Sequence, residues 1–408
     1  MGRLVSFVGL LTMLLLAWLV SENRRRMNFR LILSGVALQF AVGVLLLWSP
    51  PGRKVFEQAR VVITKIITCS DEGSKFVFST FFWDTAHFPD GPPFAITVLP
   101  TVIFFSSLTT ALFHLGFLQW VVKLMARVMV WVMDVSGSES LCTSANVFLG
   151  MTTAPLVIRP YLATMTRSEL MAMMTGGMAT VAGGTMAAYA AMGADAGHLM
   201  VASLMSAPAA LVIAKIMVPE TEDSMTKGAV KIEVVKEDAN ILDAACRGAG
   251  EGLKLALDIA AMLIAFLAIV YLVNWALSPL PSVSGEPLTL QRILGWLCAP
   301  LAWVMGVEWN DAPAVGMLLG EKTIFNEFVA YQHLTSREVA GALSPRSFTI
   351  ATYALCGFAN FGSIAVMIGG IGGLEPTRRT DFAKYGFRSM IGGALAAFMT
   401  AAIAGMLI

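Results

Sequence analysis

Glu327 is the residue in this sequence with the clearest chemical potential. It is the only charged side chain in the run Thr323–Tyr331. An ionisable group at membrane depth costs about 2.5–3.5 kcal/mol and marks a functional site by default. A carboxylate there can accept hydrogen bonds from two hydroxyl groups, such as those of a ribose 2′,3′-diol. An ion pair with Lys322 and a proton-relay role are the alternatives.

Amides and hydroxyls occur at two comparable places elsewhere in the chain, one after Glu327 and one before it. Asn360 and Ser363 stand three residues apart where small polar residues interrupt a long apolar segment, and Asn146 and Thr180 occupy similar positions earlier. Freed backbone carbonyls, an amide and a hydroxyl suit a hard cation, which prefers oxygen ligands. Each residue alone is explained equally well by a packing role with a satisfied hydrogen bond.

Composition restricts the class of protein that can present these groups. The 408 residues are 57% hydrophobic and only 13% charged, against about 25% charged in a soluble domain. Lys and Arg number 28 against 27 Asp and Glu, so no net field attracts nucleic acid. The four histidines and five cysteines show no metal, disulfide or nucleophile pattern, and no phosphate-binding loop occurs. We predict a polytopic membrane protein that is not an enzyme.

Eight charge-free stretches approach the roughly 20 residues that a helix needs to cross a bilayer. They are Leu4–Ser21, Leu31–Ser49, Pro93–Val122, Met171–Ala194, Gly197–Ala214, Ile259–Leu277, Ser347–Leu374 and Ser389–Ile408. A ninth stretch, Ile293–Val307, is short and contains Pro300, so we predict a buried or interfacial segment.

Loop charge predicts the orientation. Arg24, Arg25, Arg26 and Arg30 place the first loop in the cytoplasm. Eight crossings then put both termini outside and the basic loop at 378–388 inside, which is consistent. Basic residues among valines and isoleucines at 53–68 predict an interfacial helix, and the highly charged stretch 219–258 predicts a linker leading into a second one.

An internal repeat organises the candidate residues. Gly150 precedes Tyr161 by eleven residues, and Gly320 precedes Tyr331 by the same interval. Three crossings separate the copies, so the second must be inverted, as is typical of secondary transporters. Each copy opens with segments too short to span, at 139–150 and 308–320, which predict re-entrant hairpins followed by an interrupted helix.

This pattern predicts a division into four regions. These are a scaffold region (1–134), a first repeat in a transport unit (135–217), a linker with a scaffold span (218–307), and a second repeat (308–408).

Three segments, 154–161, 320–331 and 357–365, closely resemble the signature segments of concentrative nucleoside transporters. The resemblance implies an all-α homotrimer in the cytoplasmic membrane with eight spans, two re-entrant hairpins and interfacial helices. It also implies elevator-type uptake of nucleosides coupled to sodium. By resemblance, the ribose is bound by Glu327, Phe358, Asn360 and Ser363. By resemblance, the sodium ligands are the side chains of Asn146 and Thr180 and the carbonyls of Leu149 and Val181.

The tip of the first hairpin departs from the family pattern. The family typically has Gly-Gln-Thr-Glu-Ala-Pro, whereas this chain has Met151, Thr152 and Thr153 between Gly150 and Ala154. The substituted Gln and Glu contact the base in relatives, and each lost hydrogen bond is worth about 0.5–1.5 kcal/mol. We therefore expect an altered base preference, such as a purine or a modified base that tolerates a thioether. The alternatives are weakened uptake of ordinary pyrimidine nucleosides, transport of another ribosyl compound, proton coupling through Glu327, and a receptor that does not translocate.

Overall fold

The computed structural model describes every residue except 1, 85, 89–90, 228–237, 284 and 286, and the described residues form helices but no strand. The helices of the first half are α1 (Gly2–Leu19), α2 (Phe29–Leu47), α3 (Pro50–Phe78), η1 (Thr80–Trp83), α4 (Phe94–His114), α5 (Phe117–Met133), α6 (Gly137–Leu149), η2 (Ala154–Thr164), α7 (Arg167–Ala179), α8 (Gly183–Ala191) and α9 (Ala196–Met217). Those of the second half are α10 (Ile241–Leu277), α11 (Leu290–Val304), α12 (Ala312–Ile324), α13 (Glu327–Leu334), α14 (Arg337–Ala342), α15 (Pro345–Leu355), α16 (Phe361–Leu374), η3 (Pro376–Arg378) and α17 (Arg379–Leu407).

The eight predicted spans all fall on helices. Six helices are long and apolar enough to cross a bilayer by themselves: α1, α2, α4, α9, α10 and α17. The other two predicted spans are interrupted, one as α7 and α8 and one as α15 and α16. The polar residues at 180–185 and 360–363 therefore mark real helix breaks.

Three expectations about helix ends need correction. The stretch Pro93–Val122 is not one span, because α4 ends at His114 and Gly116 turns the chain with a φ of +87° into the amphipathic α5. The predicted second interfacial helix does not exist as a separate element, because α10 runs unbroken from Ile241 into the apolar span. The predicted first one is longer than 53–68, since α3 continues to Phe78. The linker before α10 lies partly outside the described residues.

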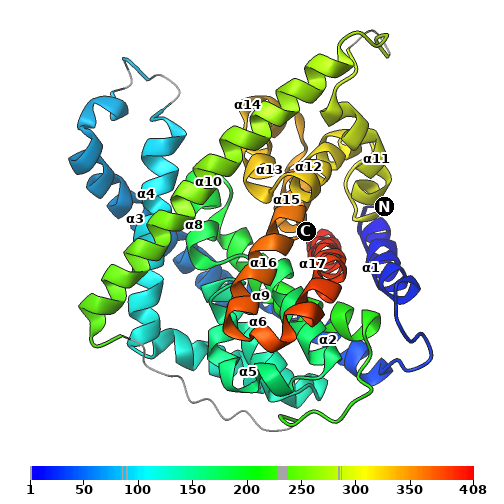
Figure 1. Ribbon diagram of the computed structural model, residues 1–408. Coiled ribbons are helices and arrows are strands. Elements are labelled where there is room, and N and C mark those ends of the chain that lie inside the picture. The colour runs from blue at the N-terminus through cyan, green and yellow to red at the C-terminus, as the bar shows by residue number, and fades with distance from the viewer. Residues whose placement is uncertain (1, 85, 89–90, 228–237, 284, 286) are drawn as a thin grey trace.

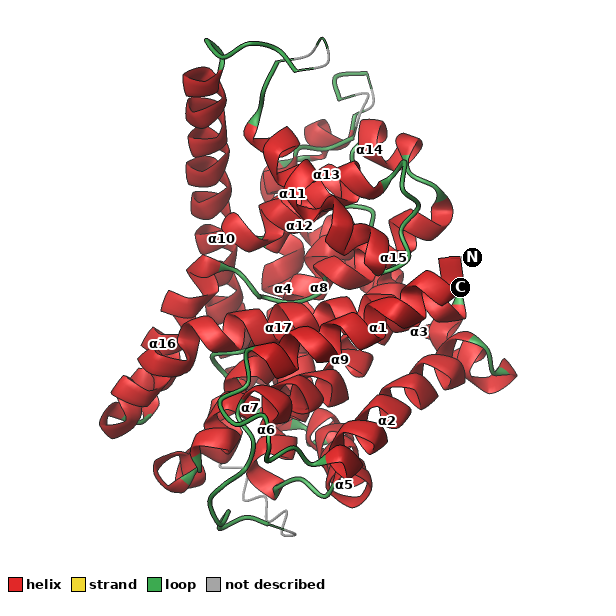
Figure 2. Ribbon diagram, turned by 90° about the vertical axis from the view of Figure 1, so that its right-hand side faces the viewer, coloured by secondary structure: helices red, strands yellow, loops and turns green. Residues whose placement is uncertain are grey.

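The two repeats share one element order and face opposite ways. Hairpin 1 consists of α6 and η2 and is followed by α7 and α8; hairpin 2 consists of α12 and α13 and is followed by α15 and α16. Figure 2 shows α6 and α7 in the lower half of the molecule, and α13 and α15 in the upper half. The inverted repeat is confirmed.

The predicted register between the repeats is wrong. Gly150 ends α6 and forms the hairpin tip, whereas Gly320 lies inside α12, four residues before its end. The equal spacing to Tyr161 and Tyr331 therefore matches residues that differ in structural position. The predicted alignment matched similar residues, whereas the structural repeat aligns the positions at which the helices end.

Burial separates the centre of the fold from its periphery. The most apolar windows of α9 and α17 are 89% and 83% buried, against 22% for α4 and α10. Figure 1 shows α3 and α4 standing at one side of the molecule, with α10 crossing in front of them. Helices α9 and α17 therefore form the packed centre around which both repeats are arranged.

The chain ends and the basic loops support the predicted even number of crossings. The guanidinium of Arg3 donates to the carbonyl of Ile408 at 3.1 Å, so both termini lie on one side (Figure 1). On the other side, Arg388 of the last basic segment pairs with Glu22 of the first loop. The first basic loop and the basic start of α17 therefore lie at the same end of the molecule; the loop predicted at 378–388 is helical.

Candidate functional site

Glu327 is the first residue of α13 and is fully buried, with 2% exposure. Its two carboxylate oxygens accept hydrogen bonds from different elements: Oε1 from the hydroxyl of Tyr189 in α8 at 3.0 Å, and Oε2 from Nδ2 of Asn360 at 2.8 Å. The carboxylate thus connects hairpin 2 to the interrupted helices of both repeats. Of the predicted ribose residues, the structure brings Glu327 and Asn360 into direct contact.

Local capping explains the orientation of these side chains. Asn326 caps α13 by accepting from the Val329 amide, which places Glu327 in the first turn. Asn360 caps α16 by accepting from the amide of Ser363 at 2.8 Å while its Nδ2 reaches Glu327. Ser363 therefore contacts Asn360 through its main chain, and Phe358 is half-buried in the break just before.

Tyr189 was not identified from the sequence. Its ring stacks on that of Tyr331 with the centroids 4.2 Å apart, and the Tyr331 hydroxyl donates to the Thr352 carbonyl at 2.7 Å. This stack fixes the phenol whose hydroxyl holds Glu327. A tyrosine in an apolar helix gave no sequence signal, because its role depends on a contact across 138 residues.

Lys322, which the sequence offered as an ion-pair partner for Glu327, does not bond to it. Lys322 is fully buried, and its Nζ donates to the Ala354 carbonyl at 2.8 Å instead of to Glu327. Among the described residues, Lys322 and Glu327 therefore form no direct ion pair, although both are buried in the same repeat.

A second polar cluster lies where the end of α6 meets the break between α7 and α8. We call this place the first junction. Oδ1 of Asn146 and Oγ1 of Thr143 are buried there, and neither has a described hydrogen-bond partner. The Thr180 hydroxyl donates to the Gly176 carbonyl at 2.8 Å, which leaves its lone pairs free to accept or coordinate. An added Cβ at Gly176 would lie 2.9 Å from Thr143 Oγ1, so Thr143 and Thr180 are both close to this residue.

This donor set fits a monovalent cation. Unpartnered buried oxygens are costly, and a hard cation is a suitable partner for the neutral oxygens of Asn146 and Thr143, which lie one helical turn apart. The main-chain positions Leu149 and Val181 end α6 and follow α7 respectively, so both lie at the same junction. Thr143 is an addition to the predicted set; its signal was its place one helical turn before Asn146.

Two glycines allow the breaks to approach one another. Gly150 has a φ of +82°, and a Cβ there would lie 2.9 Å from Cβ of Ala182 in the α7–α8 break. Gly357 has a φ of +148°, and a Cβ there would lie 3.0 Å from the carbonyl oxygens of Met178 and Ala179. The two helix breaks are therefore in direct contact at the centre of the fold.

The tip of hairpin 1 lies against α7 and α16. Cβ of Met151 packs on Gly177, at the point that Met367 also approaches, and Thr152 packs on Gly370. Met367 follows Asn360 by seven residues, or roughly 10 Å along a helix. No described contact joins Met151, Thr152 or Thr153 to Glu327. The hairpin tip packs near Met367 and Gly370 of α16, whereas Glu327 bonds to Asn360 at the start of that helix.

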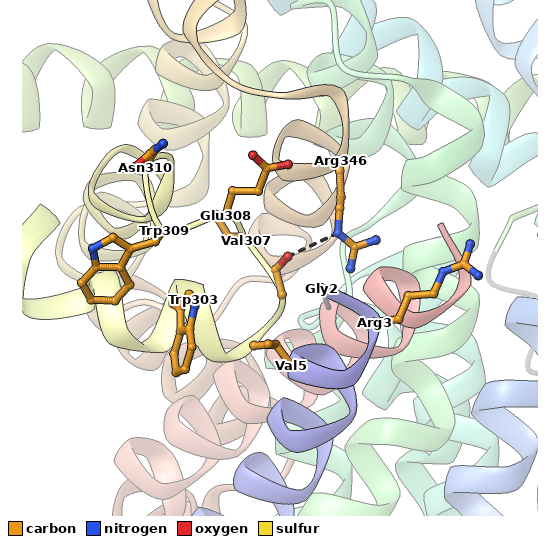
Figure 3. Close-up of a pocket in the computed structure, with 10 residues that line it drawn as sticks. Gly2, Arg3, Val5, Trp303, Val307, Glu308, Trp309, Asn310 and Arg346 are labelled. Atoms are coloured by element: carbon orange, nitrogen blue, oxygen red, sulfur yellow. Dashed lines mark hydrogen bonds between the residues drawn. The ribbon is translucent and has the colours of Figure 1, made fainter.

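The pocket in Figure 3 is a different place. It measures about 610 Å³ and is lined by the start of α1, the turn between α11 and α12, and Arg346. The Arg346 guanidinium donates to the carbonyls of Gly306 and Gly405 and to the Ser6 hydroxyl. Its charge is thus engaged in holding this turn against α1 and α17, and none of the predicted site residues lines the pocket.

Comparison with known proteins assigns the fold described above. Models of the Na+ dependent nucleoside transporter N-terminus, of a nucleoside recognition gate, and of the Na+ dependent nucleoside transporter C-terminus match residues 8–81, 95–196 and 198–405. The chain belongs to this family of concentrative nucleoside transporters. It is accordingly a multi-pass protein of the cytoplasmic membrane, and the resemblance seen in its signature segments is confirmed.

The relatives include bacterial and animal transporters. An uncharacterised transporter of Bacillus subtilis, YutK, is 40% identical over 410 residues and is covered completely, as is this chain. Solute carrier family 28 member 3 of mouse is 42% identical over 421 residues, covering 99% of this chain but only 59% of that protein. This chain therefore spans about three fifths of the length of that relative.

The solved structures of one concentrative nucleoside transporter, CNTnw, have the same fold. Its inward-facing, substrate-bound state covers 100% of this chain and 98% of that chain at 39% identity, with a TM-score of 0.92. A variant in an outward-facing state gives a TM-score of 0.94 at the same identity, covering 100% and 99%. The predicted all-α membrane fold is confirmed.

Proposed function

We propose that this transporter imports nucleosides together with sodium ions. The observation that carries the proposal is the buried Glu327 carboxylate, held between Tyr189 and Asn360 at the centre of two inverted repeats. A charge at that depth is retained for a ligand, and two vicinal hydroxyls of a ribose are suited to its oxygens. Asn360, Ser363 and Phe358 complete the sugar site in this proposal.

Sodium binds at the first junction in this proposal. Asn146, Thr143 and Thr180 supply side-chain oxygens, and Leu149 and Val181 supply carbonyls. The unpartnered oxygens of Asn146 and Thr143 support this assignment. The cation orders the end of hairpin 1, which adjoins the substrate site through the contacting helix breaks. Sodium and nucleoside each favour the closed arrangement, and this mutual preference couples their fluxes.

The moving unit in this proposal comprises residues 135–217 and the second repeat within 308–408, except the C-terminal end of that region, which belongs to the scaffold. Residues 1–134 and 218–307 form the rest of the scaffold, in which α4 packs along α10. The unit carries its cargo across the bilayer as an elevator within a homotrimer. Met151 and Thr153 at the tip of hairpin 1 offer a thioether and a hydroxyl where the family pattern has an amide and a carboxylate, so the base preference differs from that of typical relatives.

Thermal stabilisation of the purified protein by a panel of nucleosides and free bases, in sodium and in choline, tests the proposal. A shift produced only by nucleosides and only in sodium is expected, and the strongest ligand identifies the base. A sodium-independent shift would contradict sodium coupling and favour protons. No shift with any nucleoside would show that the altered tip has moved the protein to another substrate.

A further inference from the structure

Lys322 is an unusual buried charge that the proposed transport cycle does not use. Its side chain has no solvent exposure, and it lies in α12, two residues before the end of that helix. The nearest carboxylates along the chain are engaged elsewhere: Glu321 pairs with His333 at 2.8 Å, and Glu327 is held by Tyr189 and Asn360. An ammonium buried without a carboxylate hydrogen-bonded to it is costly, so the groups that do contact it must favour it strongly.

Those surroundings are the end of one helix and the face of an aromatic ring. Ala354 is the penultimate residue of α15, and its carbonyl, which accepts from Lys322 Nζ at 2.8 Å, is among those the helix break leaves without an intrahelical partner. The C-terminus of a helix carries a partial negative charge that favours a cation. The ring of Phe398 in α17 lies 5.7 Å from Nζ, within the range of a cation–π contact.

The helix end that contains this ammonium has a counterpart in the other repeat. Helices α6 and α12 both have 13 residues. The end of α6 meets the α7–α8 break where Gly150 lies against Ala182, and the end of α12 meets the α15–α16 break where Lys322 bonds to Ala354. Asn146 lies three residues before the end of α6, and Lys322 lies two residues before the end of α12. We call the place where the end of α12 meets the α15–α16 break the second junction.

We propose that the Lys322 ammonium is a fixed cation that does at the second junction what a sodium ion does at the first. The inference rests on the proposed sodium site in that comparison, but its contacts with Ala354 and Phe398 are independent of it. The ammonium binds the carbonyl end of α15 and so holds the break in the form that presents Asn360 to Glu327. Lys322 is thus a positioning residue for the substrate site, and the second junction needs no ion from solution.

Chemical rescue tests this role. Lys322→Ala removes a side chain equivalent to n-propylammonium, so the variant is measured with added n-propylammonium and, in parallel, with 1-propanol, which has a similar shape without the charge. We expect nucleoside binding to weaken about ten- to a hundredfold, as for a lost charge-assisted hydrogen bond. We expect n-propylammonium, but not 1-propanol, to restore it. Equal rescue by both compounds would overturn the proposal, since it would show that Lys322 only fills space.

A matched variant controls for cavity formation. Val147 is buried and lies two residues before the end of α6, the same distance as Lys322 from the end of α12. We expect Val147→Ala to gain nothing from n-propylammonium. Lys322→Met keeps the length without the charge, and it provides a second variant should Lys322→Ala fail to fold. Binding by Lys322→Met that equals the original protein would overturn the proposal.

A readout without nucleoside separates this proposal from the transport proposal. We expect n-propylammonium to raise the thermal stability of Lys322→Ala above that seen with 1-propanol, in choline and without substrate. The same compound should leave the original protein unchanged. If that holds while no nucleoside binds, the assigned substrate is wrong but the fixed cation stands. If nucleosides bind as proposed but the stability difference is missing, the fixed cation is wrong.

Discussion

The first and second junctions have the same construction and opposite chemistry. Each brings the end of a 13-residue helix against a break in a following helix. The first contains neutral oxygens from Asn146 and Thr143 that lack a described partner, whereas the second contains the ammonium of Lys322 bonded to a carbonyl. The two repeats thus share backbone geometry while their side chains differ. In the proposals above, the first junction takes a cation from solution and the second contains its own.

Glu327 belongs to the second repeat but depends on both. Its partner Tyr189 comes from α8 of the first repeat, and Asn360 comes from the break of the second. Substrate recognition in this proposal therefore requires both repeats to be in their closed positions, which a site within one repeat would not require.

The largest expected effect follows from neutralising this shared residue. Glu327→Gln keeps the shape but removes the charge that accepts two hydroxyl groups, so uptake of labelled nucleoside into proteoliposomes should fall about a hundredfold or more. Glu308→Gln is the control, because Glu308 is exposed near the start of hairpin 2. Size-exclusion profiles should match the original protein for both. Near-normal uptake by Glu327→Gln would remove the basis of the sugar site.

Thr143→Val tests whether the first junction, unlike the second, needs a cation from solution. Replacing a buried, unpartnered hydroxyl by a methyl should raise stability in choline by roughly 1 kcal/mol, while the stabilisation produced by sodium should decrease. The measurement is the free energy of unfolding, or the melting temperature, as a function of sodium concentration.

Thr175→Val is the matched control for Thr143. Its hydroxyl is equally buried and unpartnered, but it faces Gly392 of α17, away from the first junction. It should raise stability without altering the response to sodium. An unchanged sodium response in Thr143→Val would exclude that hydroxyl as a ligand.

An effect of similar size is expected from the link between the repeats. Tyr189→Phe retains the stack on Tyr331 but loses the hydrogen bond to Glu327, so nucleoside affinity should fall several-fold, as expected for about 1 kcal/mol. Isothermal titration measures this change. Tyr353→Phe, which removes a hydrogen bond to His198 elsewhere, should leave affinity unchanged. Tighter binding by Tyr189→Phe would show that the tyrosine hydroxyl competes with the substrate.

The smallest effect is expected from an ion pair outside both junctions, between Asp238 before α10 and Arg247 in its first turns. The Arg247 guanidinium forms two hydrogen bonds with Asp238, at 2.7 and 2.8 Å, and holds the pKa of that carboxyl below its usual range. A lowered folded-state pKa contributes stability that is present above the unfolded value of about 3.9 and is lost as pH falls through the folded value. For a surface pair this is worth less than about 1 kcal/mol.

Thermal unfolding across the acidic range detects this contribution as a difference between the original protein and Asp238→Asn. The two should differ in stability near neutral pH and converge as pH falls below the folded-state pKa of Asp238. Sodium and nucleoside responses should be the same in both. A changed sodium response would mean that this linker is coupled to the junctions.

The sequence alone determined the membrane class, all eight spans and the existence of two interrupted helices. These features depend on local composition: long apolar runs must be helical in a bilayer, and small polar residues in them mark breaks. Glu327 was identifiable for the same reason, since one carboxylate in an apolar run is conspicuous without knowledge of its neighbours.

Only the tertiary structure decided which groups meet. Tyr189 and Asn360, which contact Glu327, are 138 and 33 residues away from it in the sequence. Lys322 bonds to the Ala354 carbonyl and not to the carboxylate of Glu327, five residues further on. The register of the repeats was misjudged because matching letters do not report where a helix ends. Which side chains pair across the fold depends on how the helices pack, and the sequence around one residue does not indicate which distant residue will contact it.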